Sequence, residues 1–100
     1  MIQEMKNVDD QMHVILAGSI YVEDAKELRE KLAGLIEKGQ INLLFDLSQV
    51  DYIDSTGLGM FVSINKQAQK RGGSIMLKGL QGLVKEVFEL TRLTKVFEIQ

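Results

Sequence analysis

The chain has 100 residues, of which 45% are hydrophobic, and its formal net charge is −2. This length predicts one domain over residues 1–100, with enough apolar side chains to build a core. The lack of cysteine excludes disulfides and thiolate metal sites, and the charge, without a basic stripe, argues against direct nucleic-acid binding.

No apolar run in the chain approaches the length of a membrane span. The first four residues have neither the basic start nor the apolar core of a signal peptide. We therefore expect a cytoplasmic protein with no membrane association.

The chain is predicted to begin with a β-hairpin. Residues 2–8 form a weakly patterned strand, and residues 12–17 alternate, which is typical of a half-buried strand. One side of this second strand carries Met12, Val14 and Leu16. We expect Gly18 and Ser19 to end it.

Residues 24–38 carry an apolar stripe at helical spacing, which predicts a helix. Asp24 and Glu27 have the spacing of a capping box at its start. Gly39 follows as the expected left-handed cap.

The nearly continuous apolar run over residues 41–47 predicts a strand buried on both faces. A turn is expected over residues 46–51, after which Tyr52 and Ile53 return the chain to the sheet edge. A second helix is predicted from Ser55 to Arg71.

The remaining elements are a strand at residues 75–77, a helix with apolar residues between 80 and 88, and a last strand or docked tail at 96–97. The predicted fold is α/β, in the order β-β-α-β-α-β-α-(β). It has a mixed sheet of four to five strands and three main helices.

The loop over residues 54–59 joins the third predicted strand to the second helix. Ser55 is predicted to be the N-cap, while Gly57 and Gly59 leave backbone donors open to an anion. On this interpretation Ser55 is a phosphoacceptor within a docking surface. An equal alternative is a plain N-cap, with glycines that allow tight helix–sheet packing.

Groups suited to catalysis are scarce. His13 is the single histidine, and a Ser55–His13 pair has no third member to complete a triad. No metal or cofactor site is predicted, and the loop lacks the ending of a phosphate-binding Walker motif. A small enzyme that holds a nucleotide or phosphoester at Ser55 remains an alternative.

Met60, Phe61 and Val62 follow one another on the second predicted helix. Successive residues fan around a helix axis, so one of the three is expected to point away from the core. This makes a candidate contact surface, although a deeply packed helix explains the pattern equally well.

Residues 46–59 resemble the signature of STAS domains, and more narrowly that of bacterial anti-sigma factor antagonists. The likeness extends over essentially the whole chain, including residues 16–18, 70–73 and 80–93. One position departs from the family, because Tyr21 stands where an acidic residue is common.

The resemblance implies that the unmodified protein binds an anti-sigma factor and frees a sigma factor. It also implies that this partner is a serine kinase that uses ATP and Mg²⁺, and that a phosphatase reverses the modification. The acceptor maps to Ser55, with Thr56 as an alternative. The implied partner-binding residues are Asp54, Ser55, Thr56, Gly57, Leu58, Gly59 and Met60.

The protein itself is then expected to be a cofactor-free monomer without enzymatic activity. A non-phosphorylated regulatory or scaffold module of the same fold is the second alternative.

Overall fold

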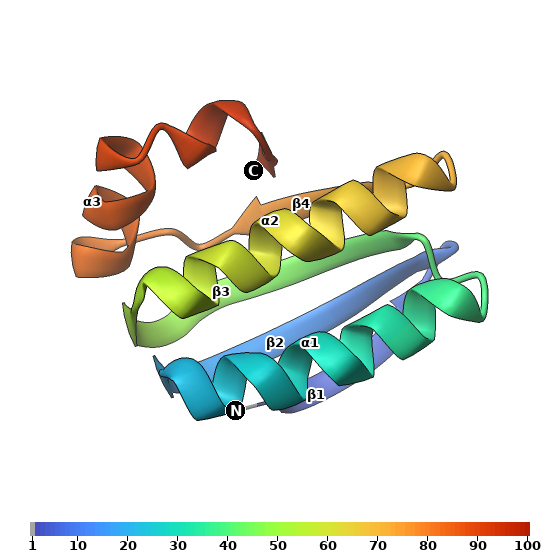
Figure 1. The fold of residues 1–100 in the computed structure, drawn as a ribbon, viewed down its shortest axis with the longest axis horizontal. Coiled ribbons are helices and arrows are strands. Elements are labelled where there is room, and N and C mark those ends of the chain that lie inside the picture. The colour runs from blue at the N-terminus through green and yellow to red at the C-terminus, as the bar shows by residue number, and fades with distance from the viewer. Residues whose placement is uncertain (1) are drawn as a thin grey trace.

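Figure 1 shows the computed structural model, which describes residues 2–100. Met1, the first residue of the predicted domain, lies outside the described residues. The elements are β1 (Ile2–Val8), β2 (Gln11–Ile20), α1 (Val22–Glu37), β3 (Asn42–Ile53), α2 (Ser55–Lys70), β4 (Ser74–Lys78), α3 (Gly82–Leu90), the 3₁₀ turn η1 (Leu93–Lys95) and β5 (Glu98–Ile99). The predicted α/β class and element order are confirmed.

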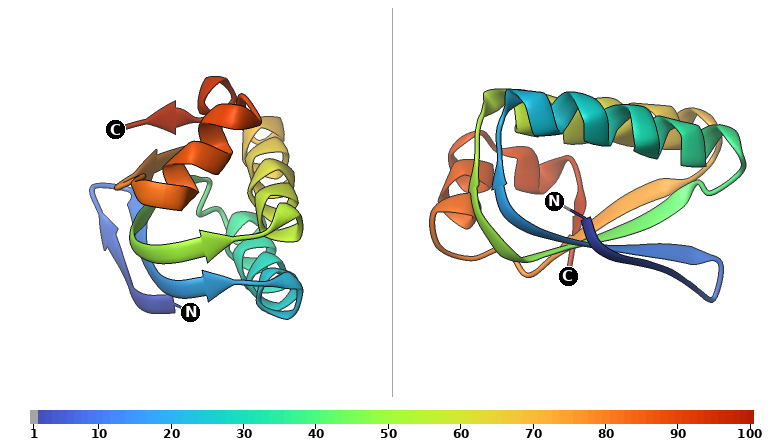
Figure 2. Two further views of the ribbon diagram at one scale, coloured as in Figure 1. Left: turned by 90° about the vertical axis from the view of Figure 1, so that its left-hand side faces the viewer. Right: turned by 90° about the horizontal axis from the view of Figure 1, so that it is seen from below.

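The five strands form one mixed sheet in the order β1-β2-β3-β4-β5. β1 and β2 are antiparallel, whereas β2, β3, β4 and β5 run parallel to one another. The helices α1 and α2 lie side by side along one face of the sheet, as Figures 1 and 2 show. The carboxyl ends of β2 and β3 therefore meet the starts of both helices at one edge.

The core lies between the sheet and the two long helices. The predicted stripe on α1 and the alternating side of β2 both face it, since Leu28, Leu32, Val14 and Leu16 are buried. Phe61 of α2 is fully buried at its centre, where its ring contacts those of two other phenylalanines. The centroid of the Phe61 ring lies 5.2 Å from that of Phe45 in β3 and 6.4 Å from that of Phe88 in α3.

The predicted turn over residues 46–51 is wrong, because β3 continues as one strand to Ile53. Ile15 pairs with Asp46 and Ala17 with Gln49, so β3 advances three residues where β2 advances two. This bulge accommodates the extra residue of the polar stretch without breaking the strand. It also bends β3 strongly, as the right view of Figure 2 shows. Buried Leu47, Val50 and Ile53 hold the bent half against the core.

Two other predicted boundaries are also wrong. Gly18 and Ser19 do not end the second strand, which extends to Ile20, a fully buried residue. The first helix begins at Val22 rather than Asp24, and the Asp24 carboxylate accepts the backbone N–H of Tyr21 at 3.2 Å. Asp24 is therefore the third residue of the first turn, and it does not lead a capping box with Glu27.

The predicted left-handed cap is confirmed, because Gly39 follows α1 with a φ of +99°. The last predicted helix occupies Gly82–Leu90, slightly later than its apolar pattern suggested. The chain end is both a docked tail and a short strand, since Phe97 is buried and Glu98–Ile99 pairs with β4.

The Phe61→Ala substitution tests the aromatic centre of the core. We expect the free energy of unfolding to fall by about 3–5 kcal/mol, because a cavity replaces contacts to both the sheet and α3. Lys66→Ala on the exposed side of the same helix is the control, with an expected change within about 0.5 kcal/mol. Equal losses in urea unfolding would contradict this placement of the core.

Candidate functional site

The loop that carries Ser55 lies at the carboxyl edge of the parallel strands, where ligands commonly meet such sheets. Ile20 ends β2 and Ile53 ends β3, and the two residues pair in register. The backbone N–H of Asp54 donates to the carbonyl of Ile20 at 3.2 Å. The start of α2 is thereby attached to the end of β2 as well as to its own strand.

Asp54, and not Ser55, is the N-cap of α2. Its backbone is extended, with a φ of −93°, and its Oδ1 accepts the N–H of Gly57 at 2.9 Å. Its carbonyl accepts the N–H of Leu58 at 3.0 Å. The prediction for Ser55 is wrong by one position because the aspartate before it is an equally good cap. Ser55 instead becomes the first helical residue.

Gly57 serves close packing rather than an open anion site. A Cβ at this position would lie 2.7 Å from Cγ1 of Ile53 and 3.1 Å from Cγ2 of Ile20. Its N–H is already bonded to Asp54, so the predicted open donor is not present. Gly59 differs, because nothing lies within 4 Å of a Cβ built there.

The predicted partner-binding residues divide into two groups in the structure. Ser55, Thr56 and Gly59 are exposed, and Asp54 is half-buried. The buried members are Gly57, Leu58 and Met60. The side chains of Leu58 and Met60 therefore belong mainly to the helix–sheet packing, while the two hydroxyl residues form the outer surface.

Among the three successive apolar residues of α2, Met60 and Phe61 are buried and Val62 is half-buried. Val62 is therefore the least buried of the three, and it still packs against the core. The deeply packed helix is the better explanation for this run.

Thr56 and Met60 also line a groove between α1 and α2, with a volume of about 280 Å³. The α1 side of this groove is formed by Val22, Glu23, Ala25, Lys26 and Arg29. Sequence reasoning did not find it, because no spacing rule indicates which faces of two separate helices meet.

A pair of tyrosines lies beside the loop. The rings of Tyr21 and Tyr52 have centroids 5.4 Å apart, and the two side chains are 52% and 37% exposed. Nearby, the Ser19 hydroxyl donates to the Asp51 carboxylate at 2.8 Å. The sequence singled out Tyr21 as a departure from the family, but Tyr52 was missed because its contact depends on strand register.

The structure does not bring His13 and Ser55 together. His13 pairs with Leu44 near the start of β3, whereas Ser55 follows the end of that strand. The His13 ring nitrogen contacts Gln11 at 3.1 Å. Because the two residues lie beside opposite ends of β3, a Ser–His catalytic pair is excluded.

Within residues 2–100, no group of three His, Asp or Glu side chains is placed to hold a metal ion. No helix in this range is long and apolar enough to cross a bilayer.

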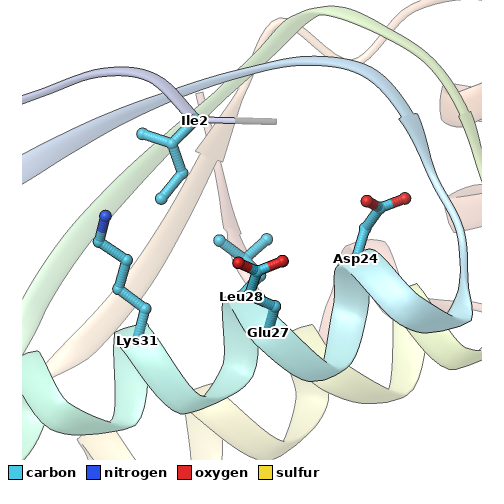
Figure 3. Close-up of a pocket in the computed structure, with 5 residues that line it drawn as sticks. All are labelled: Ile2, Asp24, Glu27, Leu28 and Lys31. Carbon is cyan, nitrogen blue, oxygen red and sulfur yellow. The ribbon is translucent and has the colours of Figure 1, made fainter.

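A hollow of about 380 Å³ lies between β1 and the outer flank of α1, and Figure 3 shows the five residues that line it. Ile2 points toward the helix there, facing Leu28 and the charged side chains of Asp24, Glu27 and Lys31. This hollow lies on the flank of α1 opposite the groove that Thr56 lines, so it is separate from the Ser55 loop.

Asp46 organises the bulge of β3. Its Oδ1 accepts the N–H of Ser48 at 3.0 Å. Partial burial raises the pKa of the Asp46 carboxyl, but the hydrogen bonds from Ser48 and the charge of Lys78 outweigh this, so the pKa lies below its ordinary value. This carboxylate therefore stabilises the fold above its unfolded pKa, and the contribution is lost as pH falls through the folded pKa.

Fold and site together define a small α/β domain with a serine displayed at a helix start on the edge of its sheet. The family model for the STAS domain matches residues 3–100. The chain therefore belongs to the STAS domain family.

The chain is also similar to named relatives. It is 40% identical over 96 residues to the anti-sigma-B factor antagonist of Bacillus subtilis (strain 168), covering 96% of this chain and 87% of that protein. It is 37% identical to the anti-sigma-B factor antagonist of Listeria monocytogenes, covering 97% of this chain and 86% of that protein.

Solved structures of the Bacillus protein SpoIIAA share the fold. The unphosphorylated anti-sigma factor antagonist SpoIIAA has a TM-score of 0.79 at 16% identity, covering all of this chain and 87% of that one. Its phosphorylated form also has a TM-score of 0.79, at 17% identity, covering 100% of this chain and 91% of that one.

Gly57→Ala and Gly59→Ala form a matched pair in the first turns of α2. We expect Gly57→Ala to lower the free energy of unfolding by about 1–3 kcal/mol, because Ile53 and Ile20 must move. Gly59→Ala should raise it by up to about 1 kcal/mol, since the site is open and alanine favours a helix. Thermal or urea unfolding measures both, and a destabilising Gly59→Ala would contradict the geometry.

The Asp54 cap gives a second pair of variants. Asp54→Ala should lower the free energy of unfolding by about 1 kcal/mol, because the N–H of Gly57 loses its acceptor. Asp54→Asn retains an acceptor and should restore most of that loss. Equal stability of Asp54→Ala and the unmodified protein would show that the cap contributes nothing.

Proposed function

We propose that this protein is an anti-sigma factor antagonist that works by partner switching. The unphosphorylated protein binds an anti-sigma factor and releases a sigma factor. Phosphorylation of Ser55 blocks that binding, and dephosphorylation restores it. The anti-sigma factor is a serine kinase that uses ATP, a separate phosphatase acts on the modified serine, and the antagonist itself is regulatory rather than catalytic.

The exposure of Ser55 is the observation that carries this proposal. Its side chain lies at the outer surface of the first turn of α2, while Gly57, Leu58 and Met60 beneath it are buried. A kinase thus has access to the hydroxyl without unfolding the loop. Family membership and the names of the similar antagonists support the partner class.

Thr56 is the alternative acceptor, because it is exposed as well. Its side chain lines the groove between α1 and α2, next to Lys26 and Arg29. Ser55 does not line that groove. The two hydroxyls therefore lie in different surroundings, and substitution of each in turn distinguishes them.

A phosphate on Ser55 is expected to leave the fold intact. It adds about −1.5 to −2 charges at the first helical residue, where the helix dipole favours a negative group by roughly 0.3–1 kcal/mol. The Asp54 carboxylate beside it opposes part of this gain. SpoIIAA shares this fold in both its unphosphorylated and its phosphorylated form, which supports a modification that leaves the domain folded.

The switch therefore acts at the interface. A nearly complete change from bound to free requires about 5.5 kcal/mol of differential binding. Burying an unpaired dianion beside Asp54, together with the bulk of the phosphate, supplies a cost of that order. No large rearrangement is needed, because the phosphate stands on the surface that the partner covers.

The test begins with a pull-down from a lysate of the source bacterium, using the unmodified protein and Ser55→Asp. We expect the unmodified protein to retain an anti-sigma factor and Ser55→Asp to bind it at least tenfold more weakly, a difference of about 1.4 kcal/mol. Thr56→Glu places the same charge one residue later and is the matched comparison.

The retained partner is then incubated with ATP and each form of the protein, and mass spectrometry locates the phosphate. We expect modification of Ser55 in the unmodified protein and in Thr56→Val, and none in Ser55→Ala. The melting temperature of Ser55→Asp should stay within a few degrees of the unmodified protein. Undiminished affinity combined with a collapsed melting temperature would refute a block at the interface.

A further inference from the structure

Among the described residues, no second strand covers the outer edge of β1. This strand is the first in the order β1-β2-β3-β4-β5, and it pairs with β2 on one side only. Ile2 and Met5 are half-buried, and its other residues are exposed. After a bulge between Ile2 and Glu4, the strand is regular over residues 4–8. An open edge of this kind is a template for pairing with another strand.

The hairpin between β1 and β2 determines which main-chain groups point to the open edge. Its two-residue loop, Asp9 and Asp10, has φ values of 51° and 65° and joins Val8 to its partner Gln11. Such a loop closes on a pair that exchanges both hydrogen bonds, and pairs of this kind alternate along an antiparallel ladder. The N–H and C=O groups of Met5 therefore point away from β2, where they can bond to an added strand.

The charges on β1 are arranged symmetrically about Met5. Glu4 precedes it and Lys6 follows it, with their charged groups 4.0 Å apart and both side chains more than half exposed. Residues two apart lie on the same face of a strand. When a second copy of β1 lies antiparallel with Met5 opposite Met5, Glu4 of each copy faces Lys6 of the other. Opposite charges directly across two strands stabilise their pairing, whereas like charges oppose it.

The same two charges select one register. A shift of the second copy by two residues places Glu4 opposite Glu4 or Lys6 opposite Lys6, so like charges meet. A shift by one residue turns the helix-covered face of the second copy to the other side of the sheet. Edge strands often carry lysines that repel a neighbour, but the alternation of sign on β1 attracts an antiparallel copy of itself.

The helix-covered side of the sheet leaves room beside β1. The hollow of about 380 Å³ that Figure 3 shows lies between this strand and the flank of α1. Its lining combines the apolar side chains of Ile2 and Leu28 with both acidic and basic groups of the helix. The helix therefore does not fill the space above the open edge, where side chains of an added strand would lie.

We propose that β1 is a self-association surface, which pairs antiparallel with β1 of a second copy about a two-fold axis at Met5. The two sheets then form one continuous sheet. This inference goes beyond the proposed function and replaces the monomer that we expected from the sequence alone. β3, which leads to Ser55, lies two strands away from the new interface, so the dimer presents two Ser55 loops.

Sedimentation equilibrium of the purified protein measures the association. One pair of strands buries less surface than a standard protein interface, so we expect a weak dimer with a dissociation constant of roughly 10 μM to 1 mM. Lys6→Glu and Glu4→Lys each bring like charges together and should weaken the dimer at least about tenfold. An equimolar mixture of these two variants restores opposite charges at both positions, and it should associate as well as the unmodified protein.

Single cysteine variants locate the axis, because the chain has no cysteine of its own. Met5→Cys brings two Cα atoms to about 5.5 Å, which is within the range of a disulfide. Val8 is the matched control: it is 38% exposed, and its two copies lie roughly 20 Å apart in this register. We expect mild oxidation to cross-link Met5→Cys at least about tenfold faster than Val8→Cys. Circular dichroism melting establishes that all variants are folded.

Three results would overturn the dimer. They are a monomer mass at all concentrations up to about 1 mM, association that neither charge reversal weakens, and faster cross-linking of Val8→Cys than of Met5→Cys. None of these measurements involves Ser55 or an anti-sigma factor. Failure of the dimer therefore leaves the switch standing, and failure of Ser55→Asp to weaken partner binding leaves the dimer standing.

Discussion

The start of α2 depends on one residue that bonds in three directions. Asp54 donates its N–H to Ile20, accepts the N–H of Gly57 with its carboxylate, and accepts that of Leu58 with its carbonyl. These bonds join the end of β2, the end of β3 and the first turn of the helix. Ser55 is left as the first helical residue, on the outside of a turn that its neighbours hold rigid.

The bend of β3 and the packing of α2 hold this junction in place. The bulge in β3 bends the strand so that Leu47, Val50 and Ile53 remain in the core while the chain reaches the helix start. Phe61, less than two turns into α2, fixes the helix against the sheet through its contact with Phe45. A loop supported in this way presents a hydroxyl in a defined position, which suits recognition by a partner and offers little scope for a large conformational switch.

The sequence predicted the class of fold and most elements, because periodic apolar residues at 12–17, 24–38 and 55–71 record burial directly. The predictions made from the sequence failed where tertiary contacts determine the structure. A polar stretch after residue 46 reads as a turn, but cross-strand pairing keeps it in β3. The choice of Asp54 over Ser55 as cap could not be made from residue type, since both are good caps. Tyr52 and the groove beside Thr56 depend on register and helix packing, which no local pattern encodes.

We propose that a phosphate on Ser55 changes what the surface can bind while the Asp54 junction stays closed. Amide hydrogen exchange of the unmodified and Ser55-phosphorylated proteins tests it most directly, read at the N–H groups of Asp54, Gly57 and Leu58. We expect all three amides to keep their protection on phosphorylation. Loss of protection at these amides would show that the modification opens the helix start, and would contradict a switch confined to the interface.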